Sequence, residues 1–316
     1  MKKRYLVVLL IILSITSLFI GVTNISPLDL FNLSNDQWDV LIISRIPRLI
    51  SIIVAGVSLS VCGLIMQQLT RNKFVSPTTA GTMDSAQLGI LVSMMLFTSA
   101  TMTQKILISF FFALLGTFIF MKILDKIKFK DAIFIPLVGL MFGGIIESIT
   151  TFFAYKQDLM QSMSAWLQGS FSGVMKGNYE VIYISVPLMI IAYLFANKFT
   201  VAGMGEEFAV NLGLNYKRVV NIGLAIVAMV TAVVILTVGS IPFLGLIIPN
   251  IVSIYRGDHL KNNLPHTALL GAIFILGCDI FGRLIIYPYE VPIGLTVGVI
   301  GSAIFAYLLL RRKAYE

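Results

Sequence analysis

Three acidic side chains lie inside stretches of this chain that are apolar enough to cross a membrane. They are Asp84, Glu147 and Asp279. A carboxylate at the centre of a bilayer costs about 3 kcal/mol on insertion scales, so each one needs a partner or a task. Arg283 follows Asp279 by one helical turn, and an ion pair within that helix is the simplest explanation. For Glu147 two roles stay open, a structural hydrogen bond or a position on a translocation path.

The motifs that would make the chain an enzyme are missing from the sequence. There is no G-x-x-x-x-G-K-[ST] phosphate loop, so the chain is not expected to hydrolyse ATP. It also has no H-E-x-x-H zinc motif and no haem or iron–sulfur ligand set. The two cysteines, Cys62 and Cys278, lie in separate apolar segments, which predicts buried thiols and neither a disulfide nor a metal pair. We therefore expect no catalytic residues, no metal and no cofactor.

The most polar stretch in the middle of the chain is 205–214, which separates two long apolar runs. It begins with Gly205 and two adjacent acids, Glu206 and Glu207, and continues with residues that favour helices. Gly213 stands where a short helix would end, because glycine readily adopts the left-handed conformation of a helix C-terminus. The pattern predicts a short helix in a polar connection.

The elements that must position these residues are membrane helices. The chain has 316 residues, of which 58% are hydrophobic and 12% charged, whereas soluble domains carry about 25% charged residues. Its apolar runs are long enough to span a bilayer as helices. The predicted fold class is all-α, a polytopic membrane protein with one domain, 1–316, and about ten transmembrane helices in the lipid bilayer. The ten candidate spans are 5–22, 48–67, 84–100, 105–124, 131–154, 179–197, 219–238, 242–256, 267–287 and 292–310.

Basic residues set the expected orientation. The net charge of +8 comes from Lys and Arg in short loops between apolar runs, a pattern typical of membrane topology and not of nucleic-acid binding. With the N-terminus inside, most of the 23 basic residues fall on the cytoplasmic side. Both termini and the segment 198–218 are then cytoplasmic, and two five-helix halves of inverted topology would meet at that segment. Residues 21–24 make a poor signal-peptide cleavage site, so an uncleaved first helix is expected.

Two local patterns predict how single spans begin and pack. Pro47 suits the start of the second span, because a proline at the first helical position leaves no amide hydrogen unpaired. Small residues recur in that span, among them Gly56 and Gly63, and such rows let helix backbones approach closely in lipid.

Six stretches, in order along nearly the whole chain, resemble the motifs of the FecCD family of ABC-transporter permeases, which import iron-siderophores, haem and cobalamin. The similar stretches, each followed by the family pattern, are 45–48 (R-[LI]-P-R), 67–77 (Q-x-x-x-x-N-P-L-A-x-P), 166–170 (W-x-x-G-S), 205–213 (G-x-x-x-A-x-x-L-G), 241–249 (I-x-F-[VI]-G-L-x-x-P) and 290–294 (E-[LV]-P-[IV]-G).

The resemblance implies a type II ABC importer permease fold and a set of partners. These are a second permease subunit in a homo- or heterodimer, two cytoplasmic ATPase subunits and an extracytoplasmic substrate-binding protein. It implies that the ATPase grips a coupling segment within 198–218. The residues carried over to that segment are Gly205, Glu206, Glu207, Phe208, Ala209, Leu212 and Gly213.

The resemblance also implies docking positions on the outer side. Arg45, Arg48 and Arg283 match positions where family permeases meet acidic residues of the binding protein, and arginine suits a bidentate bond to a carboxylate. The alternative is surface charge without a partner, or an internal pair between Asp279 and Arg283.

Two departures from the family pattern concern the cytoplasmic side. Many relatives have P-H-x-x-R where this chain has 249–253, Pro-Asn-Ile-Val-Ser, so roles of that histidine and arginine cannot be carried over. Lys73 replaces the proline of N-P-L, which predicts a less rigid loop. The P-N-I-V-S variant resembles permeases of catecholate-siderophore systems.

The sequence thus favours the permease subunit of an ATP-driven importer for an iron-siderophore in the cell membrane. Haem or cobalamin, carried by the same family, remain alternatives. An ion-coupled secondary transporter would need acids at the membrane midplane or broken helices that coordinate an ion, and this chain offers few. An integral membrane enzyme would need a polar catalytic cluster, and none is evident.

Overall fold

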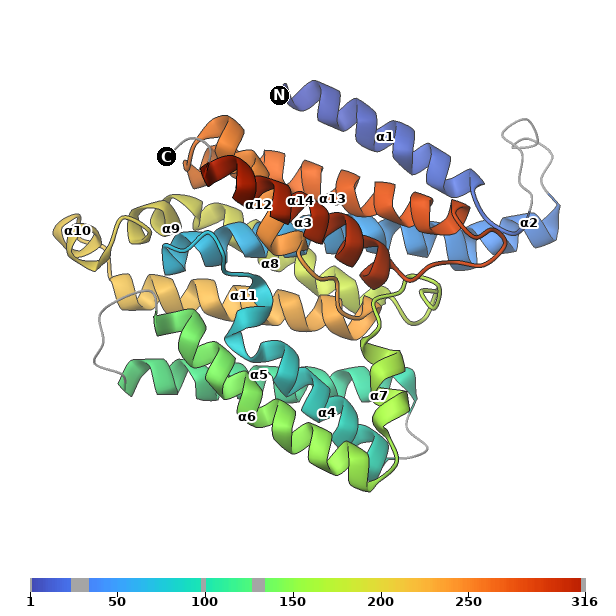
Figure 1. Ribbon diagram of the computed structural model, residues 1–316, viewed down its shortest axis with the longest axis horizontal. Coiled ribbons are helices and arrows are strands. Elements are labelled where there is room, and N and C mark those ends of the chain that lie inside the picture. Colours follow the sequence, from blue (N-terminus) through green and yellow to red (C-terminus); the bar gives the residue numbers. More distant parts are fainter. Residues whose placement is uncertain (1, 24–33, 98–100, 127–133, 314–316) are drawn as a thin grey trace.

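The computed structural model describes residues 2–23, 34–97, 101–126 and 134–313, and within them the chain is a bundle of helices (Figure 1). In chain order these are α1 (Lys3–Phe19), α2 (Asn35–Val40), the π-helical turn η2 (Leu41–Arg45), α3 (Ile46–Thr70), the 3-10 turn η3 (Pro77–Ala80), α4 (Thr82–Leu96), α5 (Met102–Lys126), α6 (Phe134–Lys156), α7 (Met160–Leu167), the 3-10 turn η4 (Glu180–Ile184), α8 (Ser185–Leu194), α9 (Ala196–Ala202), α10 (Glu206–Asn211), α11 (Tyr216–Val238), α12 (Leu244–Arg256), α13 (Leu260–Leu284) and α14 (Ile293–Lys313).

Helices α3 and α11 form the centre of the bundle. In their most apolar 18-residue stretches, 72% and 78% of the residues are buried, against 33% in α5 and 28% in α6. The main core lies between α3, α11 and α13, and a smaller one joins α4 and α5 to α11. In Figure 1, α4, α5 and α6 form a separate group below the plane of α3, α13 and α14. Since α5 and α6 bury so little, their outer faces must be covered by lipid or by another protein.

The predicted spans overlap the observed helices, apart from residues 98–100 and 131–133 of two spans, which lie outside the described residues. Each of the ten overlaps one of α1, α3, α4, α5, α6, α11, α12, α13 and α14, or the bent pair of η4–α8 and α9. By length and composition five helices of the described chain can each cross a membrane alone, and the pair Glu180–Leu194 and Ala196–Ala202, bent by 60°, counts as a sixth. The chain is therefore a multi-pass helical membrane protein, and the count of ten is approximate.

The second span begins earlier than predicted. Helical structure is continuous over Asn35–Thr70, and Ser34 caps its start with a reciprocal Ser34–Gln37 capping box. Pro47 therefore lies inside this long helix and does not begin it. The π-helical turn η2 comes just before Pro47, whose missing amide hydrogen frees the Ile43 carbonyl. The backbone N–H of Lys176 donates to that carbonyl at 2.9 Å.

The glycines of α3 allow the close packing that the sequence predicts. A Cβ on Gly63 would lie 1.8 Å from the Gly245 carbonyl oxygen of α12, and one on Gly56 would lie 2.9 Å from the Gly271 oxygen of α13. Backbones of α3, α12 and α13 are thus in direct contact, which is the use that membrane helices make of small residues.

Two of the motif stretches meet each other and the end of α11 through their main chains. The Ser170 N–H donates to the Val238 carbonyl at 2.9 Å, and the Gly294 N–H donates to the Gly169 carbonyl at 3.0 Å. A Cβ on Gly169 would lie 2.2 Å from the Ser240 oxygen. The W-x-x-G-S and E-V-P-I-G stretches therefore share one junction with the end of α11, and glycine is needed there for space.

Candidate coupling and docking sites

Helix α10 is the short helix predicted in the polar connection. It covers Glu206–Asn211 and lies at the same end of the molecule as the C-terminal end of α14 (Figure 1). Gly213 ends it in the left-handed conformation, with φ +76°. The Gly213 N–H donates to the Val210 carbonyl at 2.8 Å, and the Leu214 N–H donates to the Ala209 carbonyl at 2.9 Å. These two bonds are the Schellman motif, which confirms Gly213 as the glycine that ends this helix.

One face of α10 is anchored and the rest is exposed. Ala209 is fully buried, and α10 rests on α9 and α11. Phe208 is 49% exposed and Leu212 62%, and both acids, Glu206 and Glu207, are exposed as well. Large apolar side chains gathered on a polar connection indicate a surface that another protein covers.

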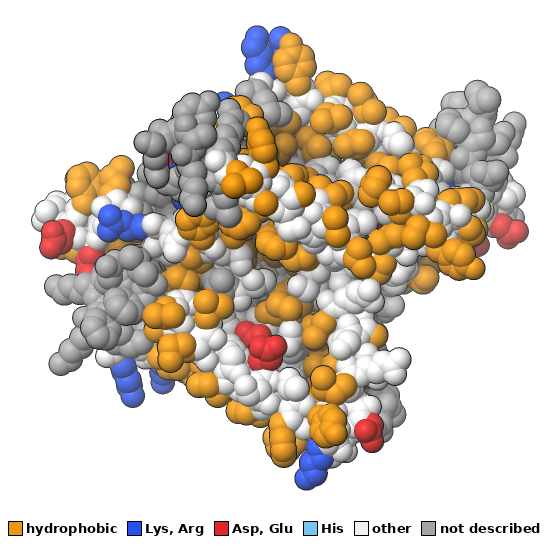
Figure 2. All heavy atoms as spheres, in the orientation of Figure 1, with side chains coloured by type: hydrophobic (Ala, Val, Ile, Leu, Met, Phe, Trp, Pro, Cys, Tyr) orange, Lys and Arg blue, Asp and Glu red, His pale blue; other side chains and the backbone are white. Residues whose placement is uncertain are grey.

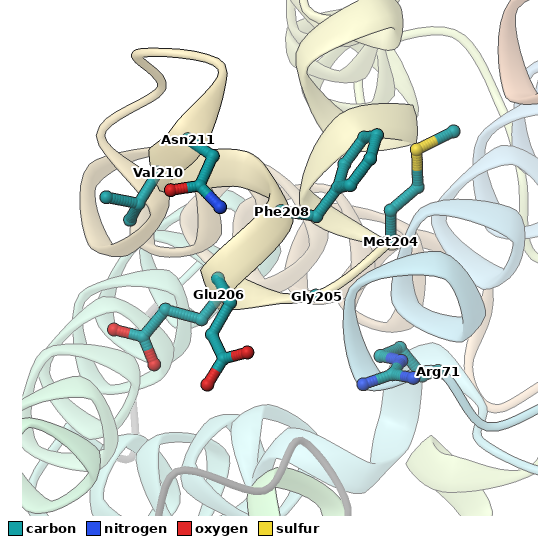
Figure 3. Close-up of a pocket in the computed structure, with 8 residues that line it drawn as sticks. Arg71, Met204, Gly205, Glu206, Phe208, Val210 and Asn211 are labelled. Carbon is teal, nitrogen blue, oxygen red and sulfur yellow. The ribbon is translucent and has the colours of Figure 1, made fainter.

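A cavity of about 720 Å³ opens beside α10, and Figure 3 shows the residues around it. It is lined by Arg71, Met204, Gly205, Glu206, Glu207, Phe208, Val210 and Asn211. Arg71 comes from the end of α3, and its Nη1 lies 3.6 Å from where a Cβ on Gly205 would be. With φ at +116°, position 205 strongly favours glycine. The sequence reasoning missed Arg71 and Met204, although Arg71 stands inside a family motif.

At the other end of the bundle, Arg48 joins two distant motif stretches. It bonds to Asp279 and to Glu290, in each case at 2.8 Å. Asp279 also forms an ion pair with Arg283 at 2.7 Å, which is the pair that their i,i+4 spacing predicts. Glu290 belongs to the E-V-P-I-G stretch, but the sequence did not predict that it pairs with Arg48.

Two of the three predicted docking arginines are buried inside the chain. Arg283 donates to the Ser17 carbonyl at 3.1 Å and to the Ile20 carbonyl at 2.8 Å, and Arg45 donates to the carbonyls of Leu18 and Thr23. The carbonyls of Ser17, Leu18 and Ile20 belong to the C-terminal end of α1 and its cap, where a helix leaves acceptors without partners, and Thr23 lies in the bend that follows. Arg45 is 7% and Arg283 5% exposed. In this conformation they fasten α1, and Arg48 is the partly exposed member of the three.

Glu147 lies on the exposed face of α6. Asp84 of α4 reaches the same helix one turn earlier, and a Cβ on Gly143 would lie 2.3 Å from its Oδ2. Figure 2 shows acidic side chains at the middle of one face, in the hollow between the two helix groups. A carboxylate exposed at this level cannot face lipid cheaply, so this part of α6 faces water or protein.

Comparisons with known proteins agree with the motif resemblance. The family described as the FecCD transport family matches residues 9–311. The petrobactin import system permease protein YclN of Bacillus subtilis is 69% identical over 315 residues, which is 100% of both chains. The ferric-anguibactin transport system permease protein FatD of Vibrio anguillarum is 42% identical over 300 residues, 95% of this chain and 96% of that one. A solved inward-facing transporter of the metal-chelate ABC type superposes with a TM-score of 0.84 at 22% identity, covering 98% of each chain, and so shares the fold.

Proposed function

Because the chain belongs to the FecCD transport family, we propose that it is the membrane permease subunit of an ATP-driven importer that carries an iron-siderophore into the cell. The names of the relatives carry the choice of cargo, since two of them transport petrobactin and ferric anguibactin. The exposed apolar surface of α10 supports ATP as the energy source. It gives a separate ATPase a place to bind on a chain that has no phosphate loop of its own.

The partners follow from the exposed surfaces. One ATPase subunit binds α10 and its cavity on the cytoplasmic side, where both termini also lie, and the second ATPase subunit binds the other permease subunit. A second permease subunit covers the poorly buried face of α6, so that Glu147 lines a water-filled path between the two subunits. A substrate-binding protein docks on the outer side. A short rigid helix suits the task of α10, because a conformational change is transmitted only through contacts that differ between two states.

Reconstitution tests this function directly. The chain is purified with an ATPase, a second permease subunit and a siderophore-binding protein of its own organism, and inserted into liposomes. We expect ATP hydrolysis that rises when the ferric siderophore and the binding protein are both present, together with uptake of ⁵⁵Fe. A rate of ATP hydrolysis that does not change when the ligand is added, or uptake driven by an ion gradient without ATP, would reject the proposal.

Docking on the outer side is proposed to involve Arg48, which is partly exposed beside Glu290. Arg48→Gln is expected to weaken capture of the binding protein, because electrostatic pairs across an interface steer association and hold register. Arg48→Lys keeps the charge and serves as the control. Capture is measured on folded protein at two salt concentrations. If Arg48→Gln lowers the unfolding temperature but leaves capture per folded molecule unchanged, Arg48 is structural and docking lies elsewhere.

A further inference from the structure

The residues by which this chain departs from its family pattern are in contact with one another. Lys73 follows α3, and Asn250 and Ser253 lie on α12, some 180 positions later in the sequence. The Lys73 Nζ donates to the Ser253 Oγ at 2.8 Å, and the Asn250 Nδ2 donates to the Lys73 carbonyl at 2.8 Å. The replacements in two distant motifs thus form one contact.

A fourth residue completes the cluster. Asp258 lies in the turn between α12 and α13 and accepts from the Lys73 Nζ at 3.0 Å and 3.1 Å. The Ser253 hydroxyl also donates to Asp258. Burial by itself would raise the pKa of Asp258, but the hydrogen bonds from Ser253 and Lys73 and the Lys73 charge lower it overall. Asp258 is therefore held as a carboxylate, the form that a lysine partner requires.

A short piece of chain connects the cluster to the cavity beside α10, which is called the coupling cavity below. Arg71, which lines that cavity, ends α3 in the left-handed conformation with φ 52°, and Lys73 follows two residues later. Phe74, the next residue, packs edge-to-face on Phe305 of α14, with ring centroids 6.2 Å apart. The loop after α3 is thus held on one side by α12 and its turn and on the other by α14.

A proline at position 73 would stiffen this loop through its ring, which fixes the backbone φ angle. A lysine has no such constraint, and the sequence alone predicts a looser loop. Here the side chain supplies the restraint, by reaching across to α12 and the turn that follows.

We propose that Lys73, Asn250, Ser253 and Asp258 form a polar latch, which makes the coupling end of α3 move together with α12 and α13. Lys73 is 44% and Asp258 62% exposed, and an ion pair this accessible to solvent contributes only weakly to stability. The latch therefore acts on the coupling of motion between these helices and adds little to the stability of the fold.

A double-mutant cycle in the assembled transporter tests the latch. Lys73→Ala and Asp258→Ala are measured singly and together, beside the charge swap Lys73→Asp with Asp258→Lys. Exposed Lys261, in the first turn of α13, provides the matched control Lys261→Ala. Each single change is expected to lower the stimulation of ATP hydrolysis by ligand. The double variant should be no worse than either single one, the swap should restore most of the stimulation, and the control should keep it all.

The effect on ATP hydrolysis rests on the proposed function, but the contact does not, so unfolding of the permease alone is measured on the same variants. We expect the two changes to be coupled by up to about five-fold in the unfolding equilibrium, the range found for exposed pairs. Coupled unfolding without ligand-stimulated hydrolysis in the unmodified protein would reject the proposed function and leave the contact standing. Additive effects in both measurements, or a swap that restores nothing, would overturn the latch.

Discussion

Replacing Phe208 and Leu212 together by aspartate is expected to abolish both uptake and the stimulation of ATP hydrolysis by ligand. Both side chains are about half exposed or more on α10, where they form the apolar part of the proposed ATPase contact. Apolar anchors at the centre of an interface typically contribute about 2 kcal/mol each, which is roughly 30-fold in affinity per residue. The measurement is co-purification of the ATPase, followed by hydrolysis and uptake in liposomes.

Three controls separate lost contact from lost fold. Phe208→Tyr with Leu212→Met keeps apolar surface at both positions and is expected to retain activity. Glu206→Gln with Glu207→Gln removes only the charges, and so measures their share of the contact. Capture of the binding protein on the outer side should survive in every variant. Normal ligand-stimulated hydrolysis in the aspartate variant would show that the ATPase grips another surface.

Removing the carboxylate of Asp279 is expected to be the most destabilising single change in the outer half of the protein. Asp279 bonds both Arg48 and Arg283, and its side chain is almost completely buried. Asp279→Ala leaves two guanidinium groups without their shared partner, and breaking a buried ion pair from one side costs about 3–5 kcal/mol. The check is unfolding by denaturant in detergent micelles, which should occur at a lower concentration than in the unmodified protein.

The neighbouring carboxylate gives the comparison for this change. Glu290 bonds Arg48 alone and its side chain is 30% exposed, so Glu290→Ala should cost less. Asp279→Asn keeps the size and one acceptor oxygen, and is expected to fall between the two. Because Arg283 also holds the end of α1 through Ser17, loss of Asp279 should expose α1 to proteolysis first. A stability equal to that of the unmodified protein would contradict the role assigned to this network.

Local patterns predicted much of this structure. Apolar runs located the helices because membrane spans need long stretches of uninterrupted apolar residues. Gly213 marked the end of α10 because the left-handed position of a helix terminus selects glycine locally. The pair of Asp279 and Arg283 followed from helical spacing alone.

Contacts between distant segments could not be predicted in the same way. Arg45 and Arg283 were expected on the outer surface, but their partners are mainly main-chain carbonyls of α1, which leave no signature in a sequence. Lys73 was expected to loosen its loop because it replaces a proline. Its partners on α12 and beyond lie about 180 residues away, so the sequence did not reveal them. The helix over Asn35–Thr70 was predicted too short, because Pro47 is typical of a helix start. Here a π-helical turn before Pro47 lets the helix continue through it.

That unbroken helix also sets a mechanical relation between the two sides of the membrane. Its 36 residues extend over about 54 Å at 1.5 Å per residue, well beyond a hydrocarbon layer of about 30 Å. One rod therefore connects the exposed Trp38, at the outer end, with Arg71 at the coupling cavity. The π-helical turn before Pro47 is its weakest point against bending. Beyond that turn the helix packs on α12 and α13, so we expect a tilt of its far end to displace Arg71 sideways at the coupling cavity.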